Sequence, residues 1–125
     1  MVKTFISIAV VCLILAIGII FENNFTQNEF VEFHQTLESL YEKVNDKTAV
    51  EDDAYAVQNC WLEKKKYLHT FIPHTEIKEF DLWIAESIKL IRDKKWEDAL
   101  SKVEVLLELS EQVPKTFKLS LENIL

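Results

Sequence analysis

The sequence predicts an all-α protein, in which an N-terminal transmembrane helix leads into a small antiparallel bundle of four to five helices. Three observations support this fold class. An unbroken apolar run opens the chain, and apolar residues then recur every three or four positions through most of the remaining sequence. The composition is the third observation, because one Gly and two Pro leave too few turn residues for a β-sandwich or a barrel.

The apolar run lies at residues 5–21 and contains no charged side chain. A helix of this length is about 26 Å long at roughly 1.5 Å per residue, close to a bilayer core of about 30 Å. It is apolar on every side, and only lipid or a large protein interior hides such a helix. We therefore expect the chain to contact the lipid bilayer through residues 5–21. The residues that mark this predicted transmembrane segment are Phe5, Cys12, Gly18 and Phe21.

The charges that flank the run predict its orientation. Lys3 precedes it, and no Lys or Arg follows until Lys43. The positive-inside rule then places the N-terminus in the cytoplasm. We expect a single-pass protein of the cell membrane, with residues 1–25 as the anchor and residues 26–125 as an extracytoplasmic helical bundle. Two alternatives remain open: a cleaved signal peptide, although no A-x-A-like site follows the run, and a core helix buried in protein.

The composition limits the partners of the bundle. The chain holds 14 Lys and Arg against 21 Asp and Glu, a net charge of −7. Phosphate contacts need a basic surface, so no nucleic acid partner is expected, and anionic lipid headgroups should repel the domain. Cys12, in lipid, cannot reach Cys60 in the bundle to form a disulfide. We expect Cys60 to be a small buried residue, with an intermolecular disulfide as the alternative.

Four or five helices are predicted after the apolar run. Thr26 with Glu29, and Thr48 with Glu51, have the capping-box spacing that starts a helix. The first of these helices can run on from the anchor with only a bend at residues 23–24. Its apolar residues follow in steps of three and four, which indicates one face turned to a core.

Prolines and short polar turns set the remaining boundaries. The second helix should end near Ile72, because the residue before Pro73 resists helical torsions. The third should start near Thr75 and end at a turn over residues 93–95. The fourth carries Pro114, which either breaks it or starts a fifth helix as its first residue.

The densest cluster of polar and aromatic residues runs from residue 60 to residue 81. Three consecutive lysines in it spread over about 200° of a helix, so at least one should bury its stem against the core. We expect His74 to satisfy open backbone groups at the start of the third helix or to pair with a carboxylate. The candidate polar junction site consists of Trp61, Lys64, Lys65, His74, Glu76 and Asp81.

Neither a metal nor a cofactor is expected at this site. His74 and Glu76 are two positions apart and diverge by about 200° on a helix, whereas zinc ligands three or four apart share a face. The serines lie in helical stretches without a strained strand-to-helix turn, and the sequence has no Gly-rich phosphate loop. We therefore expect no catalytic activity.

Several residues together resemble a known family. They are Trp61, Lys64 and Lys65, then Phe71, Ile72, His74, Glu76 and Ile77, then Asp93, Trp96 and Ala99, and finally Glu122, Asn123, Ile124 and Leu125. With a short anchor before them, the chain resembles small single-span proteins of spore-forming Gram-positive bacteria, grouped as a family of unknown function. The resemblance covers most of the chain, and departs from the family where Lys78 and Glu79 follow the Glu-Ile pair. It implies membrane anchoring, a helical fold and a membrane partner. It does not indicate any reaction.

We predict a membrane-anchored helical interaction or accessory protein of the cell envelope, with a membrane or envelope protein as its partner. One alternative is an extracytoplasmic ligand or pH sensor centred on His74, because a histidine changes charge near neutral pH. Another is an envelope hydrolase, which would need two facing carboxylates or a nucleophile with its base. The segment 117–125 is expected to pack into the bundle, or else to form an apolar plug for a membrane partner.

Overall fold

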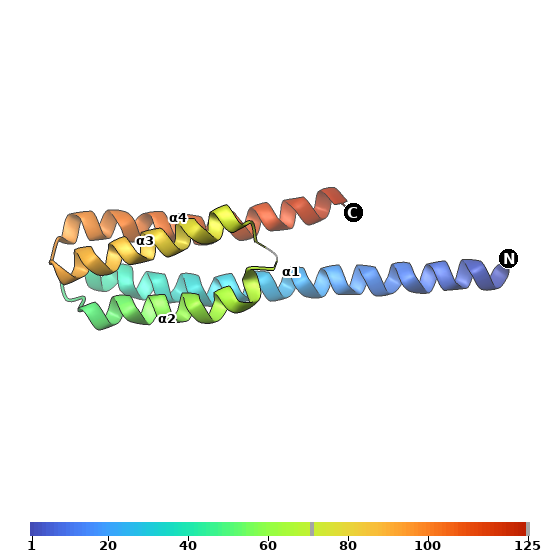
Figure 1. The fold of residues 1–125 in the computed structure, drawn as a ribbon, viewed down its shortest axis with the longest axis horizontal. Coiled ribbons are helices and arrows are strands. Elements are labelled where there is room, and N and C mark those ends of the chain that lie inside the picture. The colour runs from blue at the N-terminus through green and yellow to red at the C-terminus, as the bar shows by residue number, and fades with distance from the viewer. Residues whose placement is uncertain (71, 125) are drawn as a thin grey trace.

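The computed structural model describes residues 1–70 and 72–124, except for the side chains of residues 23, 120, 121, 122 and 124. Over these residues the chain forms helices and turns and no strand, which confirms the predicted all-α class. The four helices there are α1 (Val2–Asn45), α2 (Glu51–Leu68), α3 (His74–Arg92) and α4 (Trp96–Ile124). They pack as an antiparallel bundle, and the N-terminal half of α1 projects from one end of it (Figure 1).

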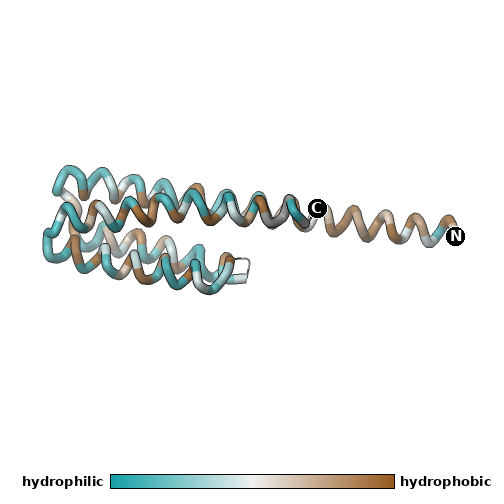
Figure 2. The backbone as a smooth tube through the Cα atoms, turned by 90° about the horizontal axis from the view of Figure 1, so that it is seen from above, coloured by the Kyte–Doolittle hydropathy of each residue, from teal (hydrophilic) through white to brown (hydrophobic). Residues whose placement is uncertain are grey.

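α1 is one helix of 44 residues that contains both the apolar run and the first helix of the bundle. The apolar run is the projecting, mostly brown stretch in Figure 2. None of the most apolar 18-residue window of α1 is buried, and α1 is the one helix in the described chain that is long and apolar enough to cross a membrane. Among the side chains described along α1, Thr26 is the first to be buried.

Two predicted helix starts are wrong because tertiary packing overrides the local signal. Thr26 lies inside α1, fully buried, and among the described residues its hydroxyl has no hydrogen-bond partner. Pro114 neither breaks α4 nor starts a fifth helix, although an interior proline costs a helix about 3 kcal/mol. Gln27 Nε2 donates a 2.8 Å hydrogen bond to the Pro114 carbonyl, which attaches α4 to α1 at the level of the proline.

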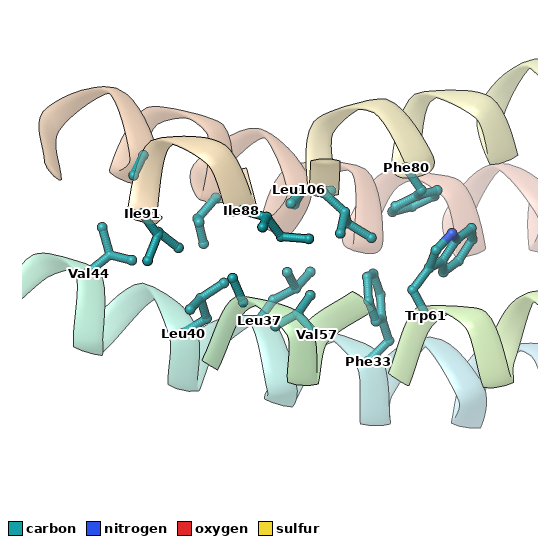
Figure 3. Close-up of a cluster of buried hydrophobic side chains, with 14 of the residues drawn as sticks. Phe33, Leu37, Leu40, Val44, Val57, Trp61, Phe80, Ile88, Ile91 and Leu106 are labelled. Carbon is teal, nitrogen blue, oxygen red and sulfur yellow. The ribbon is translucent and has the colours of Figure 1, made fainter. Parts of the chain in front are cut away.

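The core is a column of apolar side chains to which all four helices contribute (Figure 3). Its widest layer is aromatic: the ring of Trp61 lies 4.5 Å from that of Phe80 and 5.3 Å from that of Phe33, measured between centroids. Trp61 is only 1% exposed. Burial of such large side chains supplies most of the stabilisation available to a small bundle. The labelled members of the column are Phe33, Leu37, Leu40, Val44, Val57, Trp61, Phe80, Ile88, Ile91 and Leu106.

The start of α2 uses a different residue from the one predicted. The Asp53 carboxylate accepts a 2.9 Å hydrogen bond from the Val50 N–H. It also forms an ion pair with Lys43 Nζ at 2.8 Å. The Lys43 contact and then the Val50 N–H lower the pKa of Asp53. The Thr48 hydroxyl instead donates a hydrogen bond of 3.3 Å to the Lys43 carbonyl, so Thr48 does not cap α2. The helix therefore begins two residues later than its Thr–Glu spacing suggested.

The two turns at the far end of the bundle share one geometry. Lys47 after α1 and Lys94 after α3 have φ angles of 59° and 56°, in the left-handed region. In each case the backbone N–H of the next residue donates a hydrogen bond to the carbonyl five positions back. The Thr48 N–H bonds to the Lys43 carbonyl at 2.9 Å, and the Lys95 N–H to the Leu90 carbonyl at 2.9 Å. This is the Schellman ending of a helix, in which glycine is the favoured residue at the left-handed position.

Candidate functional site at the α2–α3 junction

The predicted junction site lies where α2 ends and α3 begins, at the end of the bundle that faces the apolar part of α1 (Figure 1). α2 ends at Leu68, earlier than the predicted end near Ile72, and α3 begins at His74. Pro73 occupies the N-cap position of α3, where its fixed φ and missing N–H fit a helix start. The six residues of the predicted junction site all belong to α2 and α3, but they do not form one cluster.

Asp81 is the centre of the part of the site that does assemble. Its Oδ1 accepts a 2.7 Å hydrogen bond from Trp61 Nε1, and its Oδ2 lies 2.7 Å from Lys65 Nζ. Trp61 and Lys65 belong to α2 and Asp81 to α3, so one carboxylate ties the two helices together. It also satisfies the indole N–H of a tryptophan whose ring is buried in the core.

Lys64 points away from this cluster, towards α1. Its Nζ lies 2.8 Å from Glu29 Oε2 and also contacts Glu32. Burial acts to lower the pKa of Lys64, but hydrogen bonds to Glu29 and Glu32 outweigh it and raise that pKa. The prediction that one of the three lysines buries its stem is confirmed, because Lys64 is buried while Lys66 is exposed.

His74 makes neither of the contacts expected of it among the described residues. In the described chain, His74 is exposed at the first turn of α3 and pairs with no backbone group or carboxylate. Glu76 is partly buried, and that burial, followed by the nearby charge of Glu79, raises its pKa. The expected role of His74 at the helix junction is therefore not seen among the described residues, and it stays a prediction because Phe71 lies outside them.

A groove of about 760 Å³ opens between α2 and α3 at this junction. It combines the apolar side chains Leu62 and Ile77 with several polar and ionisable ones. Lys65 is neutralised there by Asp81, and Lys66 lies 3.2 Å from Glu63. The lining residues are Asn59, Leu62, Glu63, Lys65, Lys66, His69, His74, Ile77 and Asp81.

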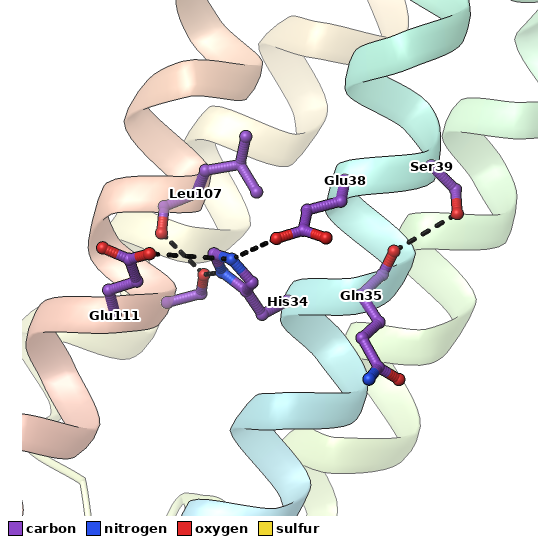
Figure 4. Close-up of polar contacts among 7 residues, drawn as sticks. His34, Gln35, Glu38, Ser39, Leu107 and Glu111 are labelled. Atoms are coloured by element: carbon purple, nitrogen blue, oxygen red, sulfur yellow. Dashed lines mark hydrogen bonds and ion pairs between the residues drawn. The ribbon is translucent and has the colours of Figure 1, made fainter.

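A second polar cluster, which the sequence reasoning missed, lies between α1 and α4. His34 Nδ1 is 2.6 Å from Ser110 Oγ, and His34 Nε2 is 2.9 Å from Glu38 Oε1 and 3.7 Å from Glu111 Oε1 (Figure 4). The Ser110 hydroxyl donates to the Leu107 carbonyl at 2.7 Å within its own helix. The four-residue spacing of His34 and Glu38 was the available signal for this cluster.

The His34 cluster joins helices and does not present a nucleophile. Ser110 is buried in the middle of α4, and its hydroxyl contacts both the Leu107 carbonyl and His34 Nδ1. The backbone N–H groups around a mid-helix serine are engaged in the helix, so they cannot stabilise an oxyanion. Among the described residues, this cluster included, no group of three His, Cys, Asp or Glu side chains could hold a metal ion.

The two cysteines lie far apart in the fold. Cys12 is exposed on the apolar part of α1, and Cys60 is half-buried in α2. The sulfur of Cys60 is 3.8 Å from Thr36 Oγ1, a contact across the α1–α2 interface. Both are free thiols.

Comparison with known proteins places the chain in a family. Residues 20–124 match the family described as "Domain of unknown function (DUF4363)", and the chain belongs to it. The matched region begins near the end of the apolar run and includes the whole bundle. No curated protein and no solved structure matches the chain.

Proposed function

We propose that this protein is a membrane-anchored accessory protein of the cell envelope, which holds a helical bundle next to the bilayer for a membrane or envelope protein partner. The observation that carries the proposal is the course of α1. Its first part is apolar and unburied, and its second part supplies one side of the bundle core. Such a bare apolar helix is stable only when lipid or another protein covers it.

The continuity of α1 gives this proposal its geometry. Because anchor and bundle share one helix, no flexible linker separates them, and the bundle stands directly on the membrane. The orientation rests on Lys3 before the span, which favours a cytoplasmic N-terminus and an extracytoplasmic bundle. A partner would then meet a rigid surface at a fixed height above the lipid.

The face of α2 and α3 is the surface that we propose for the partner. Leu62 and Leu82 are large apolar side chains left exposed on these helices. Leu62 lines the groove, whereas Leu82 lies outside it on α3 and follows the lining residue Asp81 in the sequence. Apolar side chains around a groove with a polar edge are typical of a protein contact.

Photo-crosslinking in intact membranes tests the partner. A benzoylphenylalanine replacing Leu82 should capture one defined neighbour, identified by mass spectrometry. The same residue replacing Ser101, exposed on α4, is the matched control and should capture little. Recovery of uncrosslinked monomer alone from the Leu82 position would contradict the proposed partner face.

The anchor is tested separately by membrane fractionation. The full chain should remain in the membrane pellet after an alkaline carbonate wash, and a variant that lacks residues 2–21 should be released. A full chain found in the soluble fraction, or one shortened at its N-terminus in mature material, would contradict the anchor. Because this experiment needs no partner, it separates the two halves of the proposal.

A ligand or pH sensor at the junction is the second candidate, and the groove is the observation that favours it. His69 and His74 both line it, and protonation of either adds positive charge beside Lys65 and Lys66. His74→Asn should then abolish any change in Leu82 crosslinking between about pH 5 and pH 8. Crosslinking that does not change with pH in the unaltered chain would exclude the sensor.

A further inference from the structure

We propose that the last turns of α4 enter the membrane surface beside the anchor, so that the chain meets the bilayer at two places. This inference rests on the proposed function, because it takes residues 5–21 of α1 as the span. It adds a second membrane contact, made by a helix that is more than 70 residues away from the span in sequence.

The register of α1 against α4 fixes where α4 ends. Tyr41 Oη donates to Glu104 Oε1 at 3.2 Å, His34 meets Ser110 at 2.6 Å, and Gln27 Nε2 donates to the Pro114 carbonyl at 2.8 Å. These contacts descend α1 towards the anchor while they advance along α4. The two helices therefore run antiparallel and side by side, and Gln27 and Pro114 lie at the same level.

Beyond that level α4 is longer than the remaining bundle part of α1. Ten residues of α4 follow Pro114, out to Ile124, which is about 15 Å of helix. Gln27 is six residues from Phe21, where the apolar run ends, which is about 9 Å. The end of α4 therefore passes the last residue of the run by about 6 Å, and Figure 1 shows it extending past the α2–α3 connection.

The residues along this overhang suit a membrane surface. Lys115 and Lys118 are exposed, and Leu119 is 59% exposed although it is a large apolar side chain. Lysines at this position can extend their ammonium groups to the headgroups while their stems lie on apolar surface. The sequence continues with Leu121 and Ile124, and also with Glu122, so the headgroup zone is a better fit than the hydrocarbon core.

The α2–α3 end of the bundle lies at the level of Phe21, where the apolar run ends. Tyr67 and Thr70 of α2 and its following turn line a hollow of about 360 Å³ together with Phe21 and Glu22 of α1. The ring of Tyr67 packs edge-on against Phe25 at 6.1 Å, and Tyr67 remains exposed. An exposed tyrosine next to the end of an apolar helix is typical of the membrane interface. The α2–α3 end of the bundle thus reaches the end of the apolar run, and α4 extends beyond it.

Spin-label accessibility in phosphatidylcholine bilayers tests this inference on the full chain. Single-cysteine variants Leu119→Cys, Leu82→Cys and Leu15→Cys are made in a background with Cys12→Ser and Cys60→Ser, and each is labelled with a nitroxide. All three positions are similarly exposed, at 59%, 55% and 60%. The Leu119 label should lose contact with a water-soluble nickel chelate, relative to the Leu82 label, and gain contact with oxygen. A Lys118→Cys label provides a second reading of the same turn.

The Leu15 label separates the two ways in which the inference can fail. If Leu15 is shielded from the chelate but Leu119 is as accessible as Leu82, the anchor stands and the second contact is overturned. If Leu15 is itself accessible to the chelate, the anchor is wrong and the second contact fails with it. Shielding of both Leu15 and Leu119, with Leu82 open to water, supports the inference.

Discussion

Lys64 Nζ lies 2.8 Å from Glu29 Oε2, and this ion pair joins α2 to α1 slightly more than two turns from the end of the apolar run. The Lys64 side chain is 10% exposed and that of Glu29 is 21% exposed. Removal of one partner from such a pair leaves the other charge without compensation in a poorly hydrated place. The pair therefore stabilises the packing of α2 on α1, and it lies near the proposed membrane surface.

Replacement of Lys64 should therefore destabilise the bundle. We expect Lys64→Met to lower the free energy of unfolding by about 1–3 kcal/mol, less than for a fully buried pair because Glu32 is exposed. Lys66→Met is the matched control, and a surface change of this kind should stay within about 0.5 kcal/mol. Thermal unfolding followed by circular dichroism in detergent micelles measures both. Equal melting temperatures for the two variants would show that the ion pair does not stabilise this packing.

The His34–Ser110 contact should contribute to the packing of α4 on α1. Ser110→Ala leaves His34 Nδ1 without its partner at a partly buried position, which should cost about 1–3 kcal/mol. Ser101→Ala, exposed on the same helix, is the control and should have little effect. Chemical denaturation of the two variants side by side makes the comparison. A Ser110→Ala protein as stable as the Ser101→Ala protein would assign His34 no structural role.

The left-handed residues at the far turns offer a stabilising substitution. Lys94 has a φ of 56°, a conformation that costs a non-glycine residue about 1–2 kcal/mol. Lys94→Gly should therefore raise the melting temperature, by an amount that corresponds to roughly 0.5–1 kcal/mol after the entropy of the unfolded chain is included. Lys89→Gly, in the helical part of α3, should lower the melting temperature, because glycine there costs about 1 kcal/mol of stability. Two changes of the same sign would contradict the assigned backbone geometry.

The contribution of Asp53 to stability should depend on pH. Its folded pKa is lowered from the ordinary 3.8 by Lys43 and by the Val50 N–H. A group with a depressed folded pKa stabilises the fold above its unfolded pKa, and that stabilisation is lost as the pH falls through the folded value. Asp53→Ala should thus be less stable than Asp52→Ala by about 0.5–2 kcal/mol at pH 7.

Melting curves at two pH values check the sign of this effect. The difference in stability between the Asp53→Ala and Asp52→Ala proteins should have its full value at pH 7. It should decrease steadily as the pH is lowered below 3.8, the ordinary pKa of Asp53. Both variants remove one negative charge from the first turn of α2, so the comparison cancels the interaction with the helix dipole. A gap that widens on acidification would reverse the assigned direction of the pKa shift.

Local patterns in the sequence predicted the helices better than their partners. The periodic apolar residues of α3, including Phe80, Ile88 and Ile91, lie in the core as the spacing indicated. The run of three lysines predicted one buried stem, and Lys64 has it. No pattern around residue 64 predicts Glu29 as its partner. That contact depends on the register of α2 along α1, and the packing of many side chains determines this register.

The prolines and threonines show where local signals are overruled. A capping box at Thr26 and a break at Pro114 are sound expectations for isolated helices, whose ends must satisfy their own backbone groups. In the bundle, burial of neighbouring apolar side chains stabilises the longer helices by more than these local preferences cost. At the start of α2 the local signal was close, because the predicted Thr48–Glu51 pair lies two residues before the observed Val50–Asp53 pair.

The sequence by itself determined that the chain is helical, that its first helix is apolar on every side and that its later helices each turn one apolar face inward, because these properties follow from residue type and spacing. Only the tertiary structure decided that α1 runs unbroken into the bundle, that Lys64 meets Glu29, and that α4 ends beyond the level of Phe21. These facts depend on the register between helices that are distant in sequence, and that register is set by the fit of whole surfaces.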